Sequence, residues 1–529
     1  MAANELTVAA AFRRVVHWRG DHEAAIDSRT RLTYRELDDL SDRCAALLRA
    51  RGVPQGAPVA LLLPASCIYL VAWLGAIKAG AVPMALHLRE STKQLAEICR
   101  NIGPAALVYD ATMEDAAREI EAACRSITAV VRAVTALSQE HPSPVHAVPT
   151  IPDDLLQYAA GALPIETVET DPAIIVLSSG TTSVPKGVVH THRSLLELAR
   201  TDVYLYGGLR PSDRTLVPLS PAFIGGYNGW YPFLNAGGCV VFMERFGIEA
   251  LAEKLTRERI THLFLTPTLW RRLLKVDLPG ADFSALRQIG SGAEIMDAET
   301  LTGLRERLCP NVVQVYGSTE TGAGGTCIFA DEMTDGRLVS VGRPMVNGDL
   351  RIVRPGGSPA EELPPGEVGE ILLTGPSLAA GIWGNPELTA SLFSEHDGQR
   401  WWRSRDLGRI DADGYLFVEG RSSDMIISGG INIMPAPIEE VLLAHPGVAE
   451  CAVVGVVHPE WGERVEAFIV RTTVHLAADD LDRHVLNSDL SPYQRPRLYR
   501  FVDELPRTPT NKINRTTLRH LASLDPQPN

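Results

Sequence analysis

Short apolar runs recur along the first two thirds of the chain, and longer segments with a helical repeat of apolar residues separate them. Near the N-terminus, the run at 59–63 predicts a buried strand and residues 67–79 predict a helix. Ser66 is suited to cap that helix and Gly80 to end it, and the run at 81–86 predicts the next strand. Repetition of this unit is typical of an α/β fold with mainly parallel sheets. The other strands expected are at 106–109, 129–131, 173–177, 216–219, 240–243, 262–265 and 312–316.

The pattern changes to shorter, alternating segments in the last third of the chain. Segments bounded by glycine and proline, such as 349–353 and 370–374, predict a small β subdomain over about 336–420. Beyond it, helices are expected around 438–443 and 478–487, and strands at 449–457 and 465–471. We therefore expect a large N-terminal α/β domain at 1–421 and a small α+β C-terminal domain at 422–529.

The uncharged stretch at 57–77 is long enough to suggest a membrane span. Pro64 and Ser66 divide it into the strand and the helix predicted above. We interpret the stretch as part of a core, and no membrane span is expected.

Composition narrows the class of protein. A chain of 529 residues is too long for a single core, so two or more domains are expected. The net charge of −14 argues against a nucleic-acid-binding protein, because such proteins present a basic face to phosphates. The eight cysteines show no metal-binding spacing, and the N-terminus lacks the order of a signal peptide. We expect buried thiols and a reducing, cytoplasmic environment.

A loop rich in hydroxyls and glycine follows the predicted strand at 173–177 directly. It reads Ser178-Ser179-Gly180-Thr181-Thr182-Ser183-Val184-Pro185-Lys186-Gly187, and its hydroxyls, backbone N–H groups and lysine can surround the oxygens of a polyphosphate. It differs from the common P-loop because Gly187, and no Ser or Thr, follows Lys186. An ordinary polar connection has a similar composition, so the loop alone does not decide between the two interpretations.

Two later segments place polar groups after predicted strands, where α/β sheets carry their ligand sites. These are Gly290-Ser291-Gly292-Ala293-Glu294 and Tyr316-Gly317-Ser318-Thr319-Glu320-Thr321-Gly322. In the second, Thr319 can donate to a phosphoryl oxygen and Glu320 can hold Mg²⁺. Glu320 alone would be an ordinary solvated acid.

Three segments nearer the C-terminus carry further candidate groups. Asp406 lies in the sequence SRDLG, Arg421 in GRSSD, and Lys512 in a proline-bounded loop at 506–515. Asp406 can accept hydrogen bonds from both ribose hydroxyls, and Arg421 can reach nucleotide oxygens. The alternatives are a purely structural ion pair for Asp406 and Arg421, and an ordinary exposed lysine for Lys512.

Taken together, these segments resemble the adenylate-forming superfamily of acyl-CoA synthetases, peptide-synthetase adenylation domains and luciferases. The resemblance runs from LTYREL at 32–37 and AIKAGAVP at 76–83, through the phosphate loop and YGSTETG, to the Lys512 loop. It implies a large N-terminal domain, a small mobile C-terminal domain and an active site between them. It also implies two half-reactions: a carboxylate and ATP form an acyl-adenylate and pyrophosphate, and a thiol, usually that of CoA, then displaces AMP.

The resemblance implies roles for individual residues and requires ATP, Mg²⁺ and CoA. Lys512 would stabilise the charge that develops during adenylation, Thr319 would bind the α-phosphate, and Glu320 would hold Mg²⁺. The implied nucleotide site comprises Ser178, Ser179, Gly180, Thr181, Thr182, Lys186, Gly292, Ala293, Glu294, Tyr316, Asp406 and Arg421. Ser423 would mark the hinge, and Gly429 and Gly430 would meet the pantetheine arm of CoA.

The acyl pocket is expected to use residues at 222–229 and 322–325, namely Phe223, Gly226, Tyr227, Asn228, Gly322 and Gly324. Amino-acid-activating relatives place an aspartate in the first region, and none occurs there. The small and apolar residues favour a bulky apolar or aromatic carboxylic acid. Simple helix packing would explain the glycines equally well.

Three departures from the family pattern leave alternatives open. Ser183 replaces a glycine of the phosphate loop, Ser423 replaces the usual Asp or Lys of the hinge, and Asn511 replaces the glycine before Lys512. The alternatives are an enzyme that forms only the thioester from a supplied adenylate, a loader of a carrier-protein thiol, and a non-catalytic adenylate-binding protein. The run SGGIN at 428–432 resembles free-standing CoA ligases more than carrier-loading modules. The acid and the choice between monomer and homodimer stay open.

Overall fold

The chain folds into two compact units in the computed structural model. The first comprises Met1–Leu350 and Leu373–Trp402, and the second comprises Arg351–Leu372 and Arg403–Asn529. The structure describes residues 6–135, 155–161, 167–178, 185–276, 280–294, 296–322, 324–334, 336–488, 490–507 and 513–524. The functional boundary expected between residues 421 and 422 stays a prediction.

A seven-stranded sheet in the first unit carries the strand that precedes the phosphate loop. Its order is β18-β8-β7-β4-β3-β5-β6, with β7, β4, β3, β5 and β6 parallel and with β8 and β18 antiparallel at one edge. The strands are β3 (Pro58–Leu62), β4 (Val82–Ala85), β5 (Ala106–Asp110), β6 (Ala129–Ala133), β7 (Pro172–Ser178), β8 (Lys186–Thr191) and β18 (Gly381–Ile382). The parallel part confirms the α/β pattern predicted from the apolar runs.

The second large sheet of the first unit has nine strands in the order β15-β14-β13-β12-β11-β9-β10-β1-β2. The strands from β13 to β1 are parallel, and antiparallel strands lie at both ends. They are β1 (Glu23–Ile26), β2 (Arg31–Thr33), β9 (Arg214–Val217), β10 (Cys239–Phe242), β11 (His262–Leu265), β12 (Gln288–Gly292), β13 (Val312–Tyr316), β14 (Thr326–Phe329) and β15 (Arg343–Pro344). β11 and β13 begin and end at the residues that the sequence predicts.

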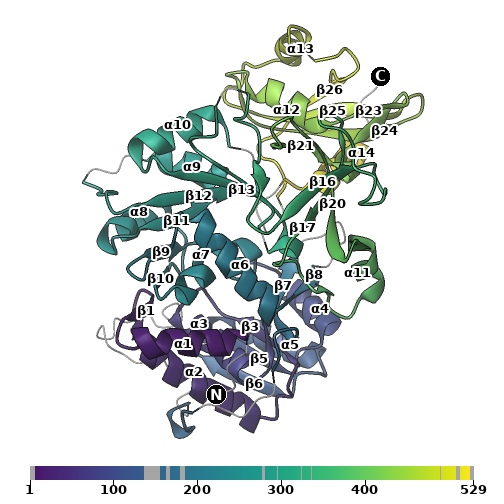
Figure 1. Ribbon diagram of the computed structural model, residues 1–529. Coiled ribbons are helices and arrows are strands. Elements are labelled where there is room, and N and C mark those ends of the chain that lie inside the picture. Colours follow the sequence, from purple (N-terminus) through teal and green to yellow (C-terminus); the bar gives the residue numbers. More distant parts are fainter. Residues whose placement is uncertain are drawn as a thin grey trace. The chain divides into compact units, whose positions relative to one another are not determined.

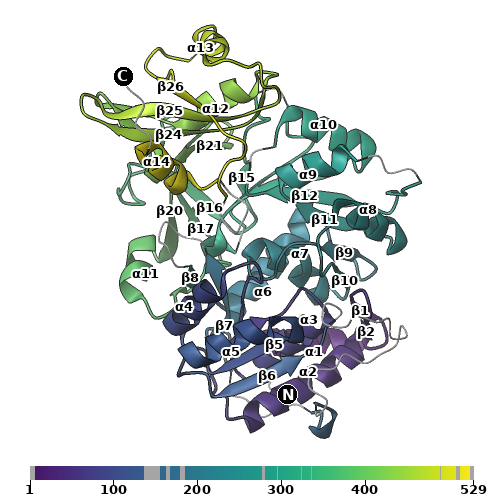
Figure 2. The same cartoon turned by 180° about the vertical axis from the view of Figure 1, so that it is seen from behind.

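Helices α6 (His192–Leu205) and α7 (Ile224–Asn235) lie between the two sheets (Figures 1 and 2). α6 packs on β7 and β8, α7 packs on β9 and β10, and the two helices contact each other. The largest core contains residues of both helices and of both sheets. Helices on the other faces are α4 (Thr92–Ile102) and α5 (Glu114–Ala123), and α8 (Ile248–Arg257), α9 (Pro267–Leu274) and α10 (Ala298–Arg307). α1 (Val8–Arg19), α2 (Tyr34–Ala50) and α11 (Pro386–Leu392) are further helices of this unit.

The uncharged stretch near the N-terminus forms core, as expected. It contains β3 and helix α3 (Cys67–Lys78), in which every residue is buried. Ser66 caps the helix by accepting a hydrogen bond from the Tyr69 N–H group. Lys78 Nζ lies 2.6 Å from Asp38 Oδ1 and 2.7 Å from Asp42 Oδ1, so its buried charge is paired. In the described part of the chain, no helix has the length and apolar character needed to cross a membrane.

Two smaller sheets follow along the chain. One joins β16 (Asp349–Val353), β17 (Gly369–Thr374), β20 (Gln399–Ile410) and β19 (Phe393–His396) in that order, and β21 (Leu416–Arg421) pairs with β20. The other has the order β23-β22-β25-β24, with β26 on β25. Its strands are β22 (Ile426–Ser428), β23 (Ile431–Ile433), β24 (Val448–His458), β25 (Gly462–Arg471) and β26 (Leu498–Phe501), and its helices are α12 (Pro435–Leu443), α13 (Ala478–Leu486) and α14 (Arg515–Leu524).

Buried histidines, among them His192 and His262, make the stability of the first unit depend on pH. His192 is 4% exposed and His262 is 0% exposed, and burial lowers the pKa of each to about 4. An unfolded chain takes up a proton at each histidine near pH 6.5, so the free energy of unfolding falls as the pH drops from 6.5 towards 4. We expect a loss of about 2 kcal/mol for each histidine at pH 5 relative to pH 7.

Thermal unfolding at pH 7 and pH 5 checks this prediction. The double variant His192→Gln, His262→Gln should show a smaller drop in unfolding midpoint between the two pH values than the unsubstituted protein. An equal drop in both proteins would contradict it.

Candidate active site

The phosphate loop joins two neighbouring antiparallel strands. In the β7–β8 pair Ser178 lies opposite Lys186, so both ends of the loop are held in register. Both residues are half-buried. The candidates Ser179, Gly180, Thr181 and Thr182, together with Ser183, lie outside the described residues. Strand β8 follows the loop, and helix α6 begins only after it.

Gly187 is required by close packing at the start of β8. A Cβ atom at this position would lie 2.7 Å from Ile102 Cδ1 and 2.9 Å from Ile175 Cγ2. Its carbonyl oxygen accepts a hydrogen bond of 2.8 Å from the Trp383 N–H group. The start of the strand that carries Lys186 is therefore packed closely against its neighbours.

Thr319 and Glu320 lie in a single helical turn, η3 (Thr319–Thr321), directly after β13. Ser318 caps this turn: its Oγ accepts from the Glu320 N–H group at 3.1 Å and donates to Glu320 Oε2 at 2.7 Å. Gly322 ends the turn in the left-handed conformation, with φ of +71°. The half-buried Glu320 carboxylate is thus oriented by its neighbour.

Glu320 is chemically suited to hold one Mg²⁺ ion that ATP brings with it. The described residues contain no group of three His, Cys, Asp or Glu side chains that could hold a metal. Mg²⁺ keeps several waters and is commonly bound through one or two carboxylates together with substrate phosphates. A single oriented carboxylate fits that mode of binding.

His190, near the end of β8, contacts the same turn. Its Nε2 lies 2.8 Å from the Thr319 carbonyl oxygen, and its Nδ1 lies 3.4 Å from Ser194 Oγ. The side chain is fully buried, and burial lowers the pKa of His190 to about 4. A carbonyl oxygen only accepts hydrogen bonds, so Nε2 carries the hydrogen. His190 was not among the residues predicted for the site from the sequence.

A second segment, residues 377–380, holds the turn from another side. Ser377 Oγ donates to the Thr321 carbonyl at 3.0 Å, and the Ala379 N–H group donates to the Glu320 carbonyl at 2.8 Å. Arg400 in turn donates to the carbonyls of Ala379 and Ala380 at 2.8 and 2.9 Å. These contacts also escaped the sequence analysis, because they depend on backbone groups of distant segments.

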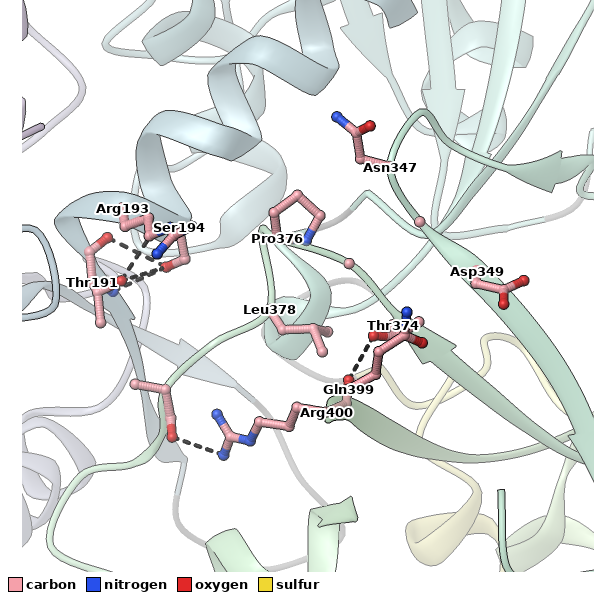
Figure 3. A pocket seen from close by; sticks show the side chains of 13 residues that line it. Thr191, Arg193, Ser194, Asn347, Asp349, Thr374, Pro376, Leu378, Gln399 and Arg400 are labelled. Carbon is pink, nitrogen blue, oxygen red and sulfur yellow. Dashed lines mark hydrogen bonds between the residues drawn. The ribbon is translucent and has the colours of Figure 1, made fainter. Parts of the chain in front are cut away.

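A cavity of about 870 Å³ lies on this segment (Figure 3). Leu378, Ala380 and Arg400 line it together with Thr191 and Ser194 at the start of α6. None of the residues predicted for the site lines this cavity. The 377–380 segment therefore separates the cavity from the turn that carries Glu320.

Helix α7 carries three of the residues expected in the acyl pocket. The Phe223 ring precedes the helix, is half-buried and lies 4.9 Å from the His87 ring. Tyr227 is fully buried, and its hydroxyl contacts Tyr69 Oη and Trp73 Nε1 at 3.1 Å each. At Gly226 a Cβ atom would overlap the Ser220 carbonyl oxygen. Gly226 thus has the helix-packing role that was the alternative for the glycines, and Tyr227 packs in the core beside it.

Asn228 connects α7 to the η3 turn. Its Nδ2 donates to the Gly322 carbonyl at 3.1 Å, whereas its Oδ1 is buried without a hydrogen-bond partner among the described residues. Gly324 lies close to Met345, where a Cβ atom would be 3.4 Å from Sδ. Of the expected acyl-pocket residues, Asn228 and Gly322 are therefore in direct contact.

The segment at 290–294 differs from the prediction in one respect. Gly290, Ser291 and Gly292 form the last part of β12 instead of following it, and Ala293 has a positive φ of +71°. Glu294 accepts a hydrogen bond from Thr268 Oγ1 at 2.7 Å. The glycines lie beneath Phe264, because a Cβ atom at 290 would lie 2.6 Å from Phe264 Cδ2. Tyr316 is the last residue of the neighbouring β13.

Asp406 and Arg421 lie opposite each other in the β20–β21 pair of the second unit. Arg421 Nε is 3.4 Å from Asp406 Oδ1, and the side chains are 53% and 14% exposed. The Asp406 N–H group donates to Ser404 Oγ at 2.9 Å. The structural ion pair that the sequence left open is present, and it leaves the Arg421 guanidinium accessible to solvent.

The remaining candidates also lie in the second unit. Ser423 is in a helical turn, η4 (Ser422–Asp424), and its carbonyl accepts from Arg519 Nη2 at 3.2 Å. Gly429 and Gly430 form the two-residue turn between β22 and β23, with φ of +59° and +80°. Both values are typical of a type I′ hairpin turn, which explains the two glycines locally.

Lys512 and Asn511 lie outside the described residues, and the ends of their loop are described. Arg507 and Ile513 form an antiparallel bridge, and the Asn514 N–H group donates to the Pro506 carbonyl at 2.7 Å. The two ends of the loop therefore lie side by side.

Two family models match the chain in these regions. The model described as AMP-binding enzyme matches residues 12–383, and that of the AMP-binding enzyme C-terminal domain matches residues 437–512. The chain belongs to the AMP-binding enzyme family. It is an acid–thiol ligase of the adenylate-forming superfamily, on the acyl-CoA ligase branch, which confirms the resemblance found in the sequence.

Relatives of known activity cover nearly the whole chain. A feruloyl-CoA synthase from an Amycolatopsis species is 32% identical over 501 residues, which are 93% of this chain and 94% of the relative. A fatty acid–[acyl-carrier-protein] ligase, ScoC, from Streptomyces coeruleorubidus is 32% identical over 502 residues, which are 92% of this chain and 91% of the relative. The crystal structure of the anthranilate CoA ligase AuaEII with anthranoyl-AMP has a TM-score of 0.86 and 25% identity, and the match covers 98% of each chain.

Two glycines of α7 test how tightly this helix is packed at its start. Gly226→Ala should destabilise the first unit by about 2 kcal/mol or more, because the new methyl group meets a backbone carbonyl that cannot turn away. Gly229→Ala in the same helix is the matched control, since nothing lies within 4 Å of a Cβ atom there. This variant should be neutral or stabilised by about 1 kcal/mol. Thermal unfolding of both variants checks the prediction, and equal midpoints would refute it.

Proposed function

We propose that the protein activates an apolar or aromatic carboxylic acid with ATP to an acyl-adenylate and then transfers the acyl group to the thiol of CoA, with release of AMP. One arrangement supports this most strongly. His190 links the strand that carries Lys186 to Thr319, and Asn228 links the helix expected at the acyl pocket to Gly322. The phosphate-binding, metal-binding and acyl-binding candidates of the first unit are thereby joined by two hydrogen bonds.

Adenylation solves the chemical problem that a carboxylate is a poor electrophile. Its negative charge repels nucleophiles and oxide leaves badly, whereas AMP leaves readily from a mixed anhydride. In the first half-reaction the carboxylate attacks the α-phosphorus of ATP, and pyrophosphate departs. In the second, the CoA thiol attacks the acyl carbon, and AMP departs with the electron pair of the broken C–O bond.

The residues of the first unit supply groups suited to the first step. Lys186 and the loop hydroxyls would bind the pyrophosphate oxygens, and Thr319 would donate to the α-phosphate. Glu320 would hold Mg²⁺, which neutralises phosphate charge when bound. In the second unit, Asp406 would accept the ribose hydroxyls, and Lys512 would bind the carboxylate and the α-phosphate in the transition state.

An uncharged acyl group is favoured by the residues around Phe223. No acidic residue occurs at 222–229 that could pair with the ammonium group of an amino acid. His87, which contacts the Phe223 ring, is neutral near pH 7 because burial lowers its pKa to about 4. This ring therefore adds no positive charge beside Phe223, although the Arg89 guanidinium is close enough to contribute to the lowered pKa of His87. Both feruloyl and fatty acyl groups, which the named relatives use, are largely apolar.

Pyrophosphate exchange over a panel of acids, followed by addition of CoA, tests the proposal. We expect exchange with aromatic or other apolar acids, weak exchange with amino acids, and an acyl-CoA product. Thioester formation only from a synthetic acyl-adenylate would favour the half-reaction enzyme suggested by Ser183, Ser423 and Asn511. Absence of exchange and of thioester formation would refute the proposed activity.

A carrier-protein thiol is the second candidate acceptor. The match to ScoC, over nearly the whole of both chains, favours it specifically. CoA and a phosphopantetheine-bearing carrier protein should be offered to the same acyl-adenylate in parallel. If the protein exchanges pyrophosphate and transfers the acyl group rapidly to the carrier protein but not to CoA, the carrier protein replaces CoA as the acceptor in the proposal.

The lysine at 512 should act in only one of the half-reactions. Lys512→Ala should slow adenylation about 100-fold or more, because it removes a preorganised charge that stabilises the transition state. Transfer from a supplied acyl-adenylate should change far less, because that step forms no bond to phosphorus. Lys275→Ala, at an exposed lysine after α9, serves as the control. Equal slowing of both half-reactions by Lys512→Ala would exclude the assigned role.

A further inference from the structure

His190 occupies a defined position on the strand that leaves the phosphate loop. Side chains on a strand alternate between its two faces, so Lys186, Val188 and His190 share one face of β8. The pairing of β8 with β7 is regular from Lys186 to His190, which lies opposite Ile174. His190 is therefore fixed relative to the lysine at the end of the phosphate loop.

Both ring nitrogens of His190 have partners. Nε2 donates to the Thr319 carbonyl at 2.8 Å, and Nδ1 lies 3.4 Å from the hydroxyl of Ser194, at the start of α6. The ring is 0% exposed. It can therefore neither rotate freely nor exchange these partners for water.

The carbonyl that His190 holds belongs to the peptide unit between Thr319 and Glu320. The N–H group of the same unit donates to Ser318 Oγ at 3.1 Å. Because a peptide unit is planar and rigid, partners at its oxygen and at its nitrogen fix its rotation. Gly322 also donates to the Thr319 carbonyl at 3.2 Å, and the next carbonyl, of Glu320, accepts from Ala379. The Cα atoms that bear the Thr319 and Glu320 side chains lie at the two ends of this fixed plane.

We propose that His190 is a positioning residue for adenylation: it holds the peptide between Thr319 and Glu320 at a fixed place relative to the β8 strand that carries Lys186, so that the three side chains meet Mg²⁺·ATP together. The inference rests on the proposed function. An apolar side chain at 190 would remove the donor on the β8 side of the peptide plane, while Ser318 and Gly322 would still hold the turn in a helical form. The η3 turn is thus expected to persist, and its orientation relative to β8 is expected to change.

His192 provides a matched control two residues further along the chain. It is also buried, at 4% exposed, and it also uses one ring nitrogen in a hydrogen bond to the backbone. Its Nδ1 accepts from the Val8 N–H group at the start of α1, at 3.2 Å. A substitution at His192 removes a comparable buried hydrogen bond, and this bond does not involve Thr319 or Glu320.

The experiment compares His190→Leu, His190→Gln and His192→Leu in the full chain. Thermal unfolding, ATP affinity with and without Mg²⁺, pyrophosphate exchange, and transfer from a synthetic acyl-adenylate are measured for each variant. We expect His190→Leu to lower the exchange rate about 30-fold or more and to remove most of the gain in ATP affinity that Mg²⁺ provides. Transfer from the supplied adenylate should stay within about threefold, because Thr319 and Glu320 act on the phosphates of the first step.

The two other variants separate positioning from folding. His190→Gln keeps an N–H donor and should recover exchange to within about fivefold of the unsubstituted protein. His192→Leu should lower the unfolding midpoint about as much as His190→Leu while its exchange rate stays within about threefold. Equal exchange defects in His190→Leu and His192→Leu, or no recovery in His190→Gln, would overturn the inference.

The nucleotide titration keeps this inference separate from the proposed function. If none of the acids tested supports pyrophosphate exchange by the unsubstituted protein, the proposed function fails. The comparison of Mg²⁺-dependent ATP affinities still decides the role of His190. If His190→Leu and His192→Leu bind ATP equally well at every Mg²⁺ concentration, His190 does not position the turn.

Discussion

The packing of α6 and α7 between the seven-stranded and the nine-stranded sheet is the constraint on which the rest of the first unit depends. Its core includes α6 and α7, which fill the space between the sheets with buried aromatic and aliphatic side chains. Protein interiors are packed as densely as organic crystals, so a helix wedged between two sheets fixes the distance between them. β8 belongs to one sheet and η3 follows β13 of the other. The hydrogen bond from His190 to Thr319 is possible only because this packing brings those two ends together.

Much of the fold was predictable because strands buried in parallel sheets have nearly continuous apolar sequences. The runs at 262–265 and 312–316 coincide with β11 and β13, and the helix at 67–79 was misjudged by a single residue at its end. The strand at one edge of the seven-stranded sheet, β18, and its neighbour β8 were not predicted. β18 has only two residues, and β8 has Val188 and Val189 between polar residues at both ends. Such strands owe their structure to the neighbour with which they pair, and a local sequence pattern does not report that neighbour.

In the candidate site, too, the sequence indicated several of the residues but not which groups they contact. Glu320, Asp406 and Lys186 were found because their segments, taken together and in order, resemble one enzyme family, whereas each residue alone would pass for an ordinary charged side chain. His190 and Arg400 were missed because their hydrogen bonds are to backbone carbonyls of distant segments. For His190 a weak signal existed: a histidine at the end of a strand that starts with a phosphate-loop lysine. Nothing in the sequence indicated that the Thr319 carbonyl would be its partner.

The pairing of Asp406 with Arg421 does not conflict with the binding of a nucleotide by either residue. The ion pair has Arg421 more than half exposed, at 53%, and exposed pairs of this kind contribute only about 0–1 kcal/mol. Ribose hydroxyls would donate to the carboxylate without displacing its charge, and the guanidinium retains several donors for nucleotide oxygens. A strong buried pair would resist any such change of partners. A weak one holds both side chains in register along β20 and β21 and lets a ligand add to them at little cost, which is the property that a reversible nucleotide site needs.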